Sequence, residues 1–182
     1  MNVLHRGGYR RRYEQIFPLF DPQVRSVCEL CFGDTLLASW CVKRGIQWTG
    51  FDLNQSFCTR AQKMGFKAIL GDVLSLDLPK SDAYIMAGSL YHFHSKLPNL
   101  FDSVLSRTKQ FIICEPVRNL SSSSGWIGSL AKRAANPGDG NAEFRYDERS
   151  LLGAIREQQS RLNFKYRVVT VDRDLLLEIR ST

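Results

Sequence analysis

The sequence predicts an α/β fold, a doubly wound and mostly parallel seven-stranded sheet with a C-terminal antiparallel hairpin. Short apolar segments, such as 82–87 and 110–114, alternate with stretches of helical spacing such as 97–106. Continuous apolar strands separated by helices are typical of parallel sheets that are covered on both faces. The last two apolar segments are joined only by Asp172-Arg173-Asp174, which favours an antiparallel hairpin at the sheet edge.

The individual elements follow from apolar spacing and from the residues that stop each helix. The first helix must end near Pro22, and the next two end at Gly45 and Gly65. In chain order we predict a helix at 13–20, strand 26–31, a helix from 36 to 44, strand 47–53, helix 56–64, strands 67–70 and 82–87, helix 97–106, strand 110–114, helix 147–161 and strands 164–171 and 175–179. The order is a helix, five β/α units and a terminal hairpin.

The segment 117–145 interrupts this alternation. It contains a serine run at 121–124 and a Pro-Gly-Asp-Gly-Asn stretch at 137–141, with room for a short helix at 126–135. Two interpretations stay open, a plain solvent loop and a lid over an active site. A chain of 182 residues can bury one full core, so we predict a single domain over 1–182, with 1–25 as N-terminal arm and helix and 117–145 as substrate lid.

Composition restricts the environment and the partners. Lys and Arg number 25 against 18 Asp and Glu, a formal charge of +7, which favours anionic partners. No apolar run approaches the roughly 20 residues that a membrane span needs. The five cysteines are odd in number and lie mostly in apolar segments, as reduced buried thiols do. We therefore expect a cytoplasmic protein with no membrane span, and the oligomeric state stays open.

The loop after the first strand is where a sheet of this kind binds its ligand. It holds Cys31, Gly33 and Thr35 and lacks the three spaced glycines that let a backbone approach a pyrophosphate, which argues against NAD and FAD. Acidic residues stand at the strand ends instead: Glu29, Asp52 and Asp72. Carboxylates there would accept hydrogen bonds from ribose hydroxyls. They would repel a diphosphate but tolerate a cationic nucleoside such as S-adenosylmethionine (SAM).

Four segments carry a resemblance to a known family: Val-Cys-Glu-Leu-Cys-Phe-Gly-Asp at 27–34, Thr-Gly-Phe-Asp-Leu-Asn at 49–54, Leu-Gly-Asp-Val-Leu at 70–74 and Asp-Ala-Tyr-Ile-Met-Ala-Gly-Ser-Leu-Tyr-His-Phe at 82–93. In order and spacing the chain resembles the class I SAM-dependent methyltransferases over residues 26–115. The main departure is the family's Gly-x-Gly-x-Gly loop, whose positions hold Cys31, Gly33 and Thr35 here.

The resemblance implies SAM as cofactor, S-adenosylhomocysteine (SAH) as product, and a methyltransferase activity. The cofactor-binding residues it implies are Glu29, Cys31, Gly33, Asp34, Asp52, Leu53, Asp72, Val73, Ala87 and Gly88. Glu29 and Asp34 would lie near the methionyl amine, Asp52 would accept the ribose hydroxyls and Asp72 the adenine amino group. The alternative is that Asp52 and Asp72 are ordinary end-of-strand turn residues.

Catalytic candidates follow the fourth strand. His92 has an unperturbed pKa suited to a general base, and Tyr91 could orient a methyl acceptor; a structural histidine is the alternative for His92 and, more so, for His94. No metal site is predicted, because His92 and His94 have no ligand-rich neighbours. The Cys28-x-x-Cys31 pair favours neither redox nor zinc chemistry, since Cys28 falls inside the buried strand and no second pair exists.

The positive charge lies outside the acidic strand ends. Arg6 and Arg10 to Arg12 form a basic arm, which could bind phosphates, be a solvated lead into the first helix, or supply an arginine that closes over the pocket onto a carboxylate. We predict a methyltransferase for a small-molecule acceptor, which the charge suggests is anionic. An RNA substrate, or a non-catalytic SAM-binding module, stays open as an alternative.

Overall fold

The computed structural model describes residues 8–117 and 144–181. Its strands are β1 (Ser26–Leu30), β2 (Gln47–Asp52), β3 (Lys67–Leu70), β4 (Ala83–Ala87), β5 (Gln110–Pro116), β6 (Phe164–Val171) and β7 (Asp174–Ser181). They form one seven-stranded sheet in the order β3-β2-β1-β4-β5-β7-β6. The first five pair in parallel, and β7 pairs antiparallel with both β5 and β6. The predicted mixed sheet with its C-terminal hairpin is confirmed.

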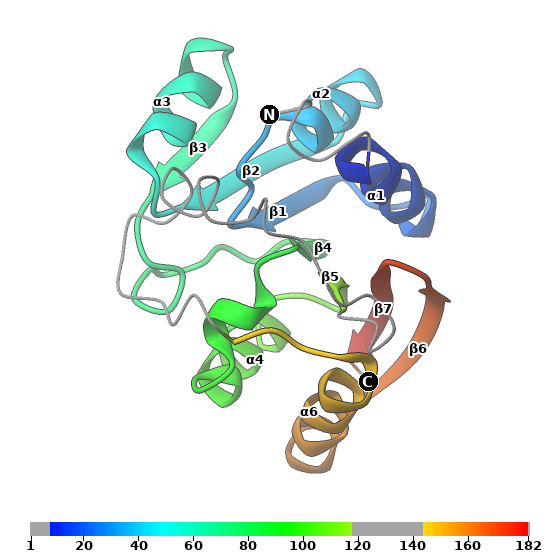
Figure 1. The fold of residues 1–182 in the computed structure, drawn as a ribbon. Coiled ribbons are helices and arrows are strands. Elements are labelled where there is room, and N and C mark those ends of the chain that lie inside the picture. Colours follow the sequence, from blue (N-terminus) through cyan, green and yellow to red (C-terminus); the bar gives the residue numbers. More distant parts are fainter. Residues whose placement is uncertain (1–7, 118–143, 182) are drawn as a thin grey trace, which may run out of the picture.

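Helices cover both faces of the sheet (Figure 1). They are α1 (Gly8–Ile16), α2 (Leu36–Lys43), α3 (Gln55–Lys63), α4 (Leu97–Leu105) and α6 (Glu148–Arg161), with 3-10 turns η1 (Phe17–Leu19) and η2 (Leu90–Phe93). Helices α1, α2 and α3 bury apolar side chains on one face, and α4 and α6 bury theirs on the other.

The central strands are apolar on both sides because each side has its own helical layer. In β4, Ala83, Ile85 and Ala87 pack under α1 to α3, while Tyr84 and Met86 belong to the core under α4 and α6. Successive side chains of a strand point to opposite faces, so a strand between two layers shows no polar alternation. This is why the sequence reads as continuous apolar runs.

Two elements differ from the prediction. The first helix begins at Gly8, not residue 13, and gives way to the 3-10 turn η1 at Phe17, because Pro18 has no amide hydrogen for a further α-helical bond. The link from β3 to β4 contains a turn and no helix, so the third of the predicted β/α units has none. Val73 and Leu78 from this link are buried in the core instead.

The chain reverses direction across the sheet between β1 and β4. It proceeds from β1 outward to β2 and β3, and then crosses back to β4 on the other side of β1. The loops after β1 and β4 therefore diverge, and open α/β sheets bind their ligands at this point, outside the carboxyl ends of the strands.

The predicted helix at 126–135 and nearly all of the predicted lid, 117–145, lie outside the described residues, and the single-domain prediction over 1–182 stays a prediction. None of the helices in the described parts of the chain combines the length and apolarity that crossing a lipid bilayer requires. The cytoplasmic location stays a prediction.

Candidate active site

Acidic side chains converge on Cys31 at the carboxyl end of β1. Burial raises the pKa of the Cys31 thiol, and the charges of Asp52, Asp72, Glu115 and Glu29 raise it further. Charges act at this strength only over short distances. The acidic side chains near the ends of β1, β2 and β5 and in the loop after β3 therefore all influence this thiol. Of these, sequence reasoning named Glu29, Asp52 and Asp72 but not Glu115.

The loop after β1 adopts a glycine-like course without the usual glycines. Cys31 has a φ of 55° and Gly33 a φ of 56°, both in the left-handed region. The Cys31 amide donates to the Phe51 carbonyl at 2.7 Å, and the Gly33 carbonyl accepts from Arg60 Nη2 at 2.9 Å. A left-handed non-glycine residue costs on the order of 1–2 kcal/mol. Cys31 thus adopts, at an energetic cost, a backbone conformation that glycine adopts freely.

Asp52 closes this loop from the end of β2. Its Oδ2 accepts from the Gly33 amide at 3.1 Å, and its Oδ1 accepts from the Asn54 amide at 2.8 Å. Burial raises the pKa of Asp52, although the backbone amides oppose the rise. Each carboxylate oxygen has a second lone pair, so Asp52 keeps the capacity to accept hydroxyl groups. The neighbouring Leu53 side chain is 57% exposed, an apolar surface next to this acceptor.

Asp72 and Asp34 each bind a nearby backbone amide. Asp72 Oδ1 accepts from the Leu74 amide at 2.9 Å, which holds the turn after β3, and Val73 is buried beside it. Asp34 Oδ1 accepts from the Leu36 amide at 3.0 Å and so satisfies the first turn of α2, where Thr35 makes no side-chain cap. These local bonds fit the turn-residue alternative, and they leave the predicted cofactor contacts as predictions.

Glu29 is completely buried and has two internal partners. Its Oε1 accepts from the Tyr13 hydroxyl at 2.6 Å, and its Oε2 accepts from the Trp48 indole Nε1 at 2.8 Å. Burial raises the pKa of Glu29 to about 8, against the effect of these bonds, and Asp34 and Asp52 raise it further. Glu29 therefore ties α1 and β2 to β1. Its predicted contact with a methionyl amine stays a prediction.

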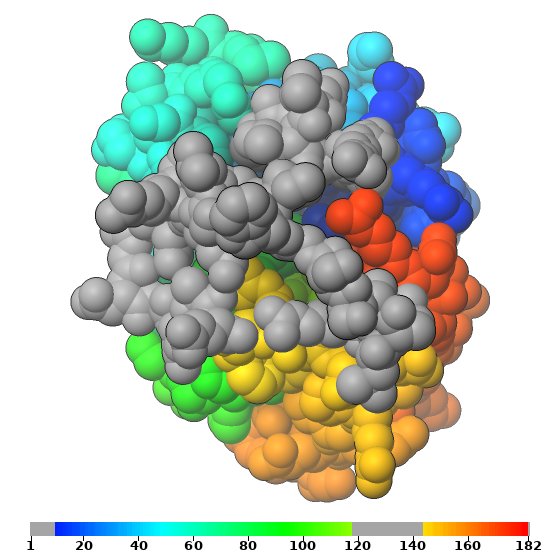
Figure 2. Space-filling model, in the orientation of Figure 1, coloured from blue at the N-terminus to red at the C-terminus, as the bar shows by residue number. Residues whose placement is uncertain are grey.

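Gly88 and Arg12 form the β4 side of the site. Gly88 has a φ of 76°, and a Cβ there would lie 2.5 Å from Arg12 Nη1. Arg12 comes from α1, and its Nε and Nη2 donate to the two oxygens of Asp174 at 3.1 and 3.0 Å. Figure 2 shows α1, in blue, beside the red C-terminal hairpin that carries Asp174. Sequence reasoning proposed an arginine near the pocket without identifying which.

The catalytic candidates lie on η2 beneath an arginine. The Arg145 guanidinium lies 3.5 Å from the centre of the Tyr91 ring, and the Tyr91 and His92 rings are 3.9 Å apart. Burial lowers the pKa of His92, and the Arg145 charge lowers it further. His92 is therefore neutral near pH 7 and able to accept a proton. His94 stacks on Phe144 at 4.2 Å, with its Nδ1 at 3.2 Å from the Tyr91 carbonyl oxygen, a structural placement.

Sequence reasoning missed Glu115, Arg145 and Tyr146. Glu115 ends β5 and is completely buried, and Tyr146 is 3% exposed. Glu115 gave a signal, since a carboxylate directly after a run of apolar residues stands at the ligand-binding edge of the sheet. Arg145 and Tyr146 gave no such signal, because they precede α6 and lie far along the chain from the strands and from η2.

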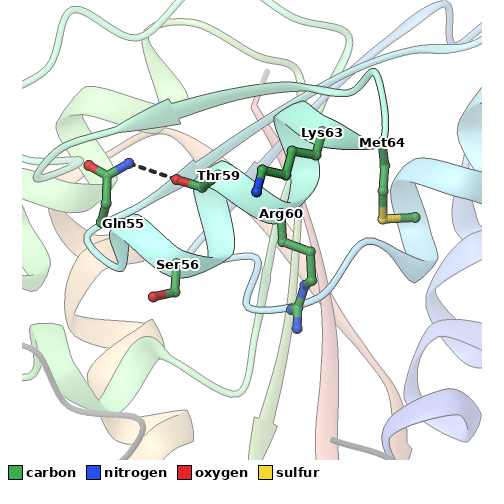
Figure 3. A pocket seen from close by; sticks show the side chains of 6 residues that line it. All are labelled: Gln55, Ser56, Thr59, Arg60, Lys63 and Met64. Atoms are coloured by element: carbon green, nitrogen blue, oxygen red, sulfur yellow. Dashed lines mark hydrogen bonds between the residues drawn. The ribbon is translucent and has the colours of Figure 1, made fainter.

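A separate hollow of about 460 Å³ lies on α3 and opens to solvent. Its lining is Gln55, Ser56, Thr59, Arg60, Lys63 and Met64 (Figure 3). None of the strand-end carboxylates lines it, so it is distinct from the site around Cys31. Among residues 8–117 and 144–181, no group of three or more His, Cys, Asp or Glu side chains is arranged to hold a metal ion.

No protein-family model matches this sequence, and no curated protein sequence matches it. Solved structures do match. The methyltransferase domain of the bacterial protein CtHen1-C superposes with a TM-score of 0.75 at 13% identity, over 96% of this chain and 98% of that one.

Two further structures are longer proteins. Human N-acetylserotonin methyltransferase, solved with SAM, matches with a TM-score of 0.65 at 15% identity, over 99% of this chain and 58% of that one. Mitomycin 7-O-methyltransferase MmcR matches with a TM-score of 0.66 at 11% identity, over 94% and 53%. The chain thus spans little more than half of each of these proteins. At these identities the matches show the fold, which is that of the class I SAM-dependent methyltransferases.

Proposed function

We propose that this chain is a SAM-dependent methyltransferase that acts on a small-molecule acceptor. The observation that carries the proposal is the convergence of Glu29, Asp52 and Asp72 on the loop after β1, at the point where the strand order reverses. Within a class I methyltransferase fold, this edge of the sheet is where a ligand binds. Solved neighbours with this fold include one that contains SAM.

The residues at the site fit SAM chemically. Asp52 would accept hydrogen bonds from the ribose hydroxyls, and exposed Leu53 would pack on the adenine. Asp72 would accept a hydrogen bond from the adenine amino group, and the Val73 backbone amide would donate one to the adenine. The sulfonium and ammonium are cations, so a ring of carboxylates favours them and disfavours diphosphates. When bound, SAM would supply an activated methyl group to a nucleophile.

The methionyl end would lie between the loop after β1 and the end of β4. Ala87 and Gly88 would face it, and Asp34 would reach its amine directly or through water. Glu29 would lie near the amine, with both of its oxygens already bonded to Tyr13 and Trp48. Arg12 Nη1 lies next to Gly88, while the other two guanidinium nitrogens hold Asp174. This arrangement supports the interpretation that an arginine of the N-terminal arm pairs with a carboxylate of the bound ligand.

On the acceptor side, His92 would serve as a base and Tyr91 would orient the acceptor. Burial raises the pKa of Tyr91, so its hydroxyl keeps its proton and can donate. Most of the acceleration would come from alignment, because the sulfonium is already a good leaving group.

The RNA alternative loses one of its arginines. Both side chains of the Arg12–Asp174 pair are only 14% exposed, so Arg12 is not available to a nucleic acid. Arg10 and Arg11 pair with Glu14 and Asp172 at the surface, where such pairs contribute little and can be exchanged for phosphates. The small-molecule acceptor is therefore favoured, and RNA is an outcome that the experiment must separate.

Calorimetric titration with SAH tests the cofactor. We expect micromolar binding, and a 10- to 100-fold loss for Asp52→Asn, about the 1.5–3 kcal/mol of a charged hydrogen bond. Asp102→Asn on α4 is the matched control and should bind as the wild type does, since Asp102 pairs with Arg161 at the surface. The absence of binding heat would refute the proposal.

Radiolabelled SAM then tests the transfer. Label in the small-molecule fraction of a cell extract supports the proposal, and label in the RNA fraction identifies the alternative substrate. SAH binding with no label in any fraction would leave a non-catalytic binding module.

A further inference from the structure

Glu115 presents one unused carboxylate oxygen at the acceptor side of the site. Its Oε2 accepts from the Leu90 amide at 2.9 Å, and the Tyr91 amide also bonds to this carboxylate. Its Oε1 has no hydrogen-bond partner among the described residues, although the side chain is completely buried. A buried carboxylate oxygen without a partner is costly, so its persistence points to a group that arrives from outside.

A second unused polar atom belongs to Tyr146. The Tyr146 hydroxyl is buried and has no partner within residues 8–117 and 144–181. Burial raises the pKa of Tyr146, and the Glu115 charge raises it further. Tyr146 therefore keeps its proton and is a hydrogen-bond donor within reach of the Glu115 charge.

Aromatic and cationic side chains surround this pair. Arg145 covers the Tyr91 ring at 3.5 Å, and the Phe144 and Tyr146 rings meet edge to face at 4.9 Å. Both Tyr91 and Phe144 are half-buried, so part of each ring remains accessible. Flat apolar surfaces next to a hydrogen-bonding pair suit a planar ring that carries one polar group.

The protonation state of Glu115 suits proton transfer. Burial raises its pKa to about 7, and the Leu90 and Tyr91 amides together with Arg12 and Arg145 limit the rise. A general base works best when its pKa lies near the operating pH. His92 is the weaker base of the two, because burial and Arg145 both lower its pKa. For a hydroxyl acceptor, Glu115 therefore takes the base role that His92 would otherwise serve.

We propose that Glu115 Oε1 is the proton acceptor for a phenolic hydroxyl of the methyl acceptor, and that the Tyr146 hydroxyl donates a hydrogen bond to the oxygen of that phenol. A hydroxyl both donates and accepts, and so uses the two unpartnered atoms together; an ammonium has no lone pair for Tyr146. This inference rests on the proposed methyltransferase function and deepens it.

The step balances as follows. The acceptor O–H bond breaks and its proton passes to Glu115 Oε1, while a new O–C bond forms at the methyl group. The electron pair of the broken C–S bond stays on sulfur, which leaves neutral SAH and a methyl ether. Glu115 then returns the proton to solvent.

Binding of phenol to the SAH-saturated protein tests this without turnover. We expect wild-type protein to bind phenol more tightly than anisole, which has no hydroxyl hydrogen. Glu115→Gln should weaken phenol binding 10-fold or more and remove the preference over anisole. Tyr146→Phe should weaken it several-fold with a normal fold. Glu157→Gln, the same change on the exposed face of α6, is the matched control and should match the wild type.

Turnover adds a second measurement. With radiolabelled SAM and a panel of substituted phenols, kcat of the wild type should rise as the pH increases through about 7. In Glu115→Gln this rise should be absent, and kcat should be 100- to 10,000-fold lower. Phenol binding that is absent, or unchanged in Glu115→Gln while SAH still binds, would overturn the inference alone. Failure of SAH to bind would instead overturn the proposed function.

Discussion

Two buried glutamates end two parallel strands of the same sheet, and their surroundings differ. Glu29 ends β1 and Glu115 ends β5, both are completely buried, and burial raises both pKa values, to about 8 and about 7. Both oxygens of Glu29 accept hydrogen bonds from internal donors, Tyr13 and Trp48. One oxygen of Glu115 accepts from backbone amides, and the other has no partner in the described residues.

The comparison shows that burial and a raised pKa do not by themselves identify a reactive carboxylate. The number of unsatisfied lone pairs separates the two glutamates, since a fully bonded carboxylate fixes neighbouring elements and a half-bonded one can receive a ligand. We therefore expect changes at Glu29 to act mainly on stability, and changes at Glu115 mainly on acceptor chemistry.

The largest expected effect is on the folding of the Glu29 region. Glu29→Ala leaves the Tyr13 hydroxyl and the Trp48 indole N–H without their buried acceptor, which should lower the free energy of unfolding by about 3–5 kcal/mol. Urea denaturation measures this. Tyr13→Phe removes one of the two bonds and should cost markedly less. A loss below about 1 kcal/mol for Glu29→Ala would remove the structural role that the comparison assigns to it.

The next effect is a pH dependence of stability. Glu115 keeps its proton up to about pH 7 when folded, but loses it near 4.5 when unfolded, so its contribution is complete below 4.5 and is lost as the pH rises to about 7. Glu29 acts in the same direction up to about pH 8. Between pH 4.5 and 7, the free energy of unfolding of Glu115→Gln should fall by roughly 1–3 kcal/mol less than that of the wild type.

Glu178 is a control whose stability contribution depends on pH in the opposite direction. Burial acts to raise the pKa of Glu178, but hydrogen bonds from Arg167 and Gln110 hold it below its usual value. Its contribution is lost as the pH falls, so Glu178→Gln should flatten the acid side of the stability curve. Parallel curves for Glu115→Gln and wild type from pH 4.5 to 7 would contradict the raised pKa.

An effect of similar size tests the packing of Gly88 against Arg12. Gly88→Ala places a Cβ 2.5 Å from Arg12 Nη1 and requires a left-handed alanine, which should cost about 1–3 kcal/mol in stability. Because the Asp174 pair pins Arg12, the clash is not relieved by simple rotation. Part of the cost should disappear in combination with Arg12→Gln, and a strictly additive double variant would show that the two residues do not press on each other.

The smallest effect concerns Cys31, whose thiol pKa is raised by the charges of both glutamates. Cys31→Gly relieves the φ of 55° but gives up side-chain packing and adds flexibility to the unfolded chain, so stability should change by less than about 1 kcal/mol. Cys31→Val should be clearly worse, because a β-branched residue is poorly tolerated at positive φ. Thermal unfolding of the pair gives the order, and equal losses would argue against backbone strain at this position.

Much of the fold was predictable because hydrophobic spacing is a local property. The apolar runs at 82–87 and 110–114 predicted buried parallel strands, and the structure places both in the centre of the sheet. The link between β3 and β4 counts among the five predicted β/α units although no helix is predicted at 71–81, and the structure buries Val73 and Leu78 there without a helix.

The sequence by itself determined that acidic residues stand at the carboxyl ends of the strands, since strand ends and residue types are both readable along the chain. Only the tertiary structure decided which of them has a carboxylate oxygen without a hydrogen-bond partner in the described residues. Glu29 receives its partners from 16 and 19 residues away, and Arg12 meets Asp174 across 162 residues. Hydrogen bonds are short and directional, so whether a buried carboxylate is satisfied depends on distant segments brought together by folding.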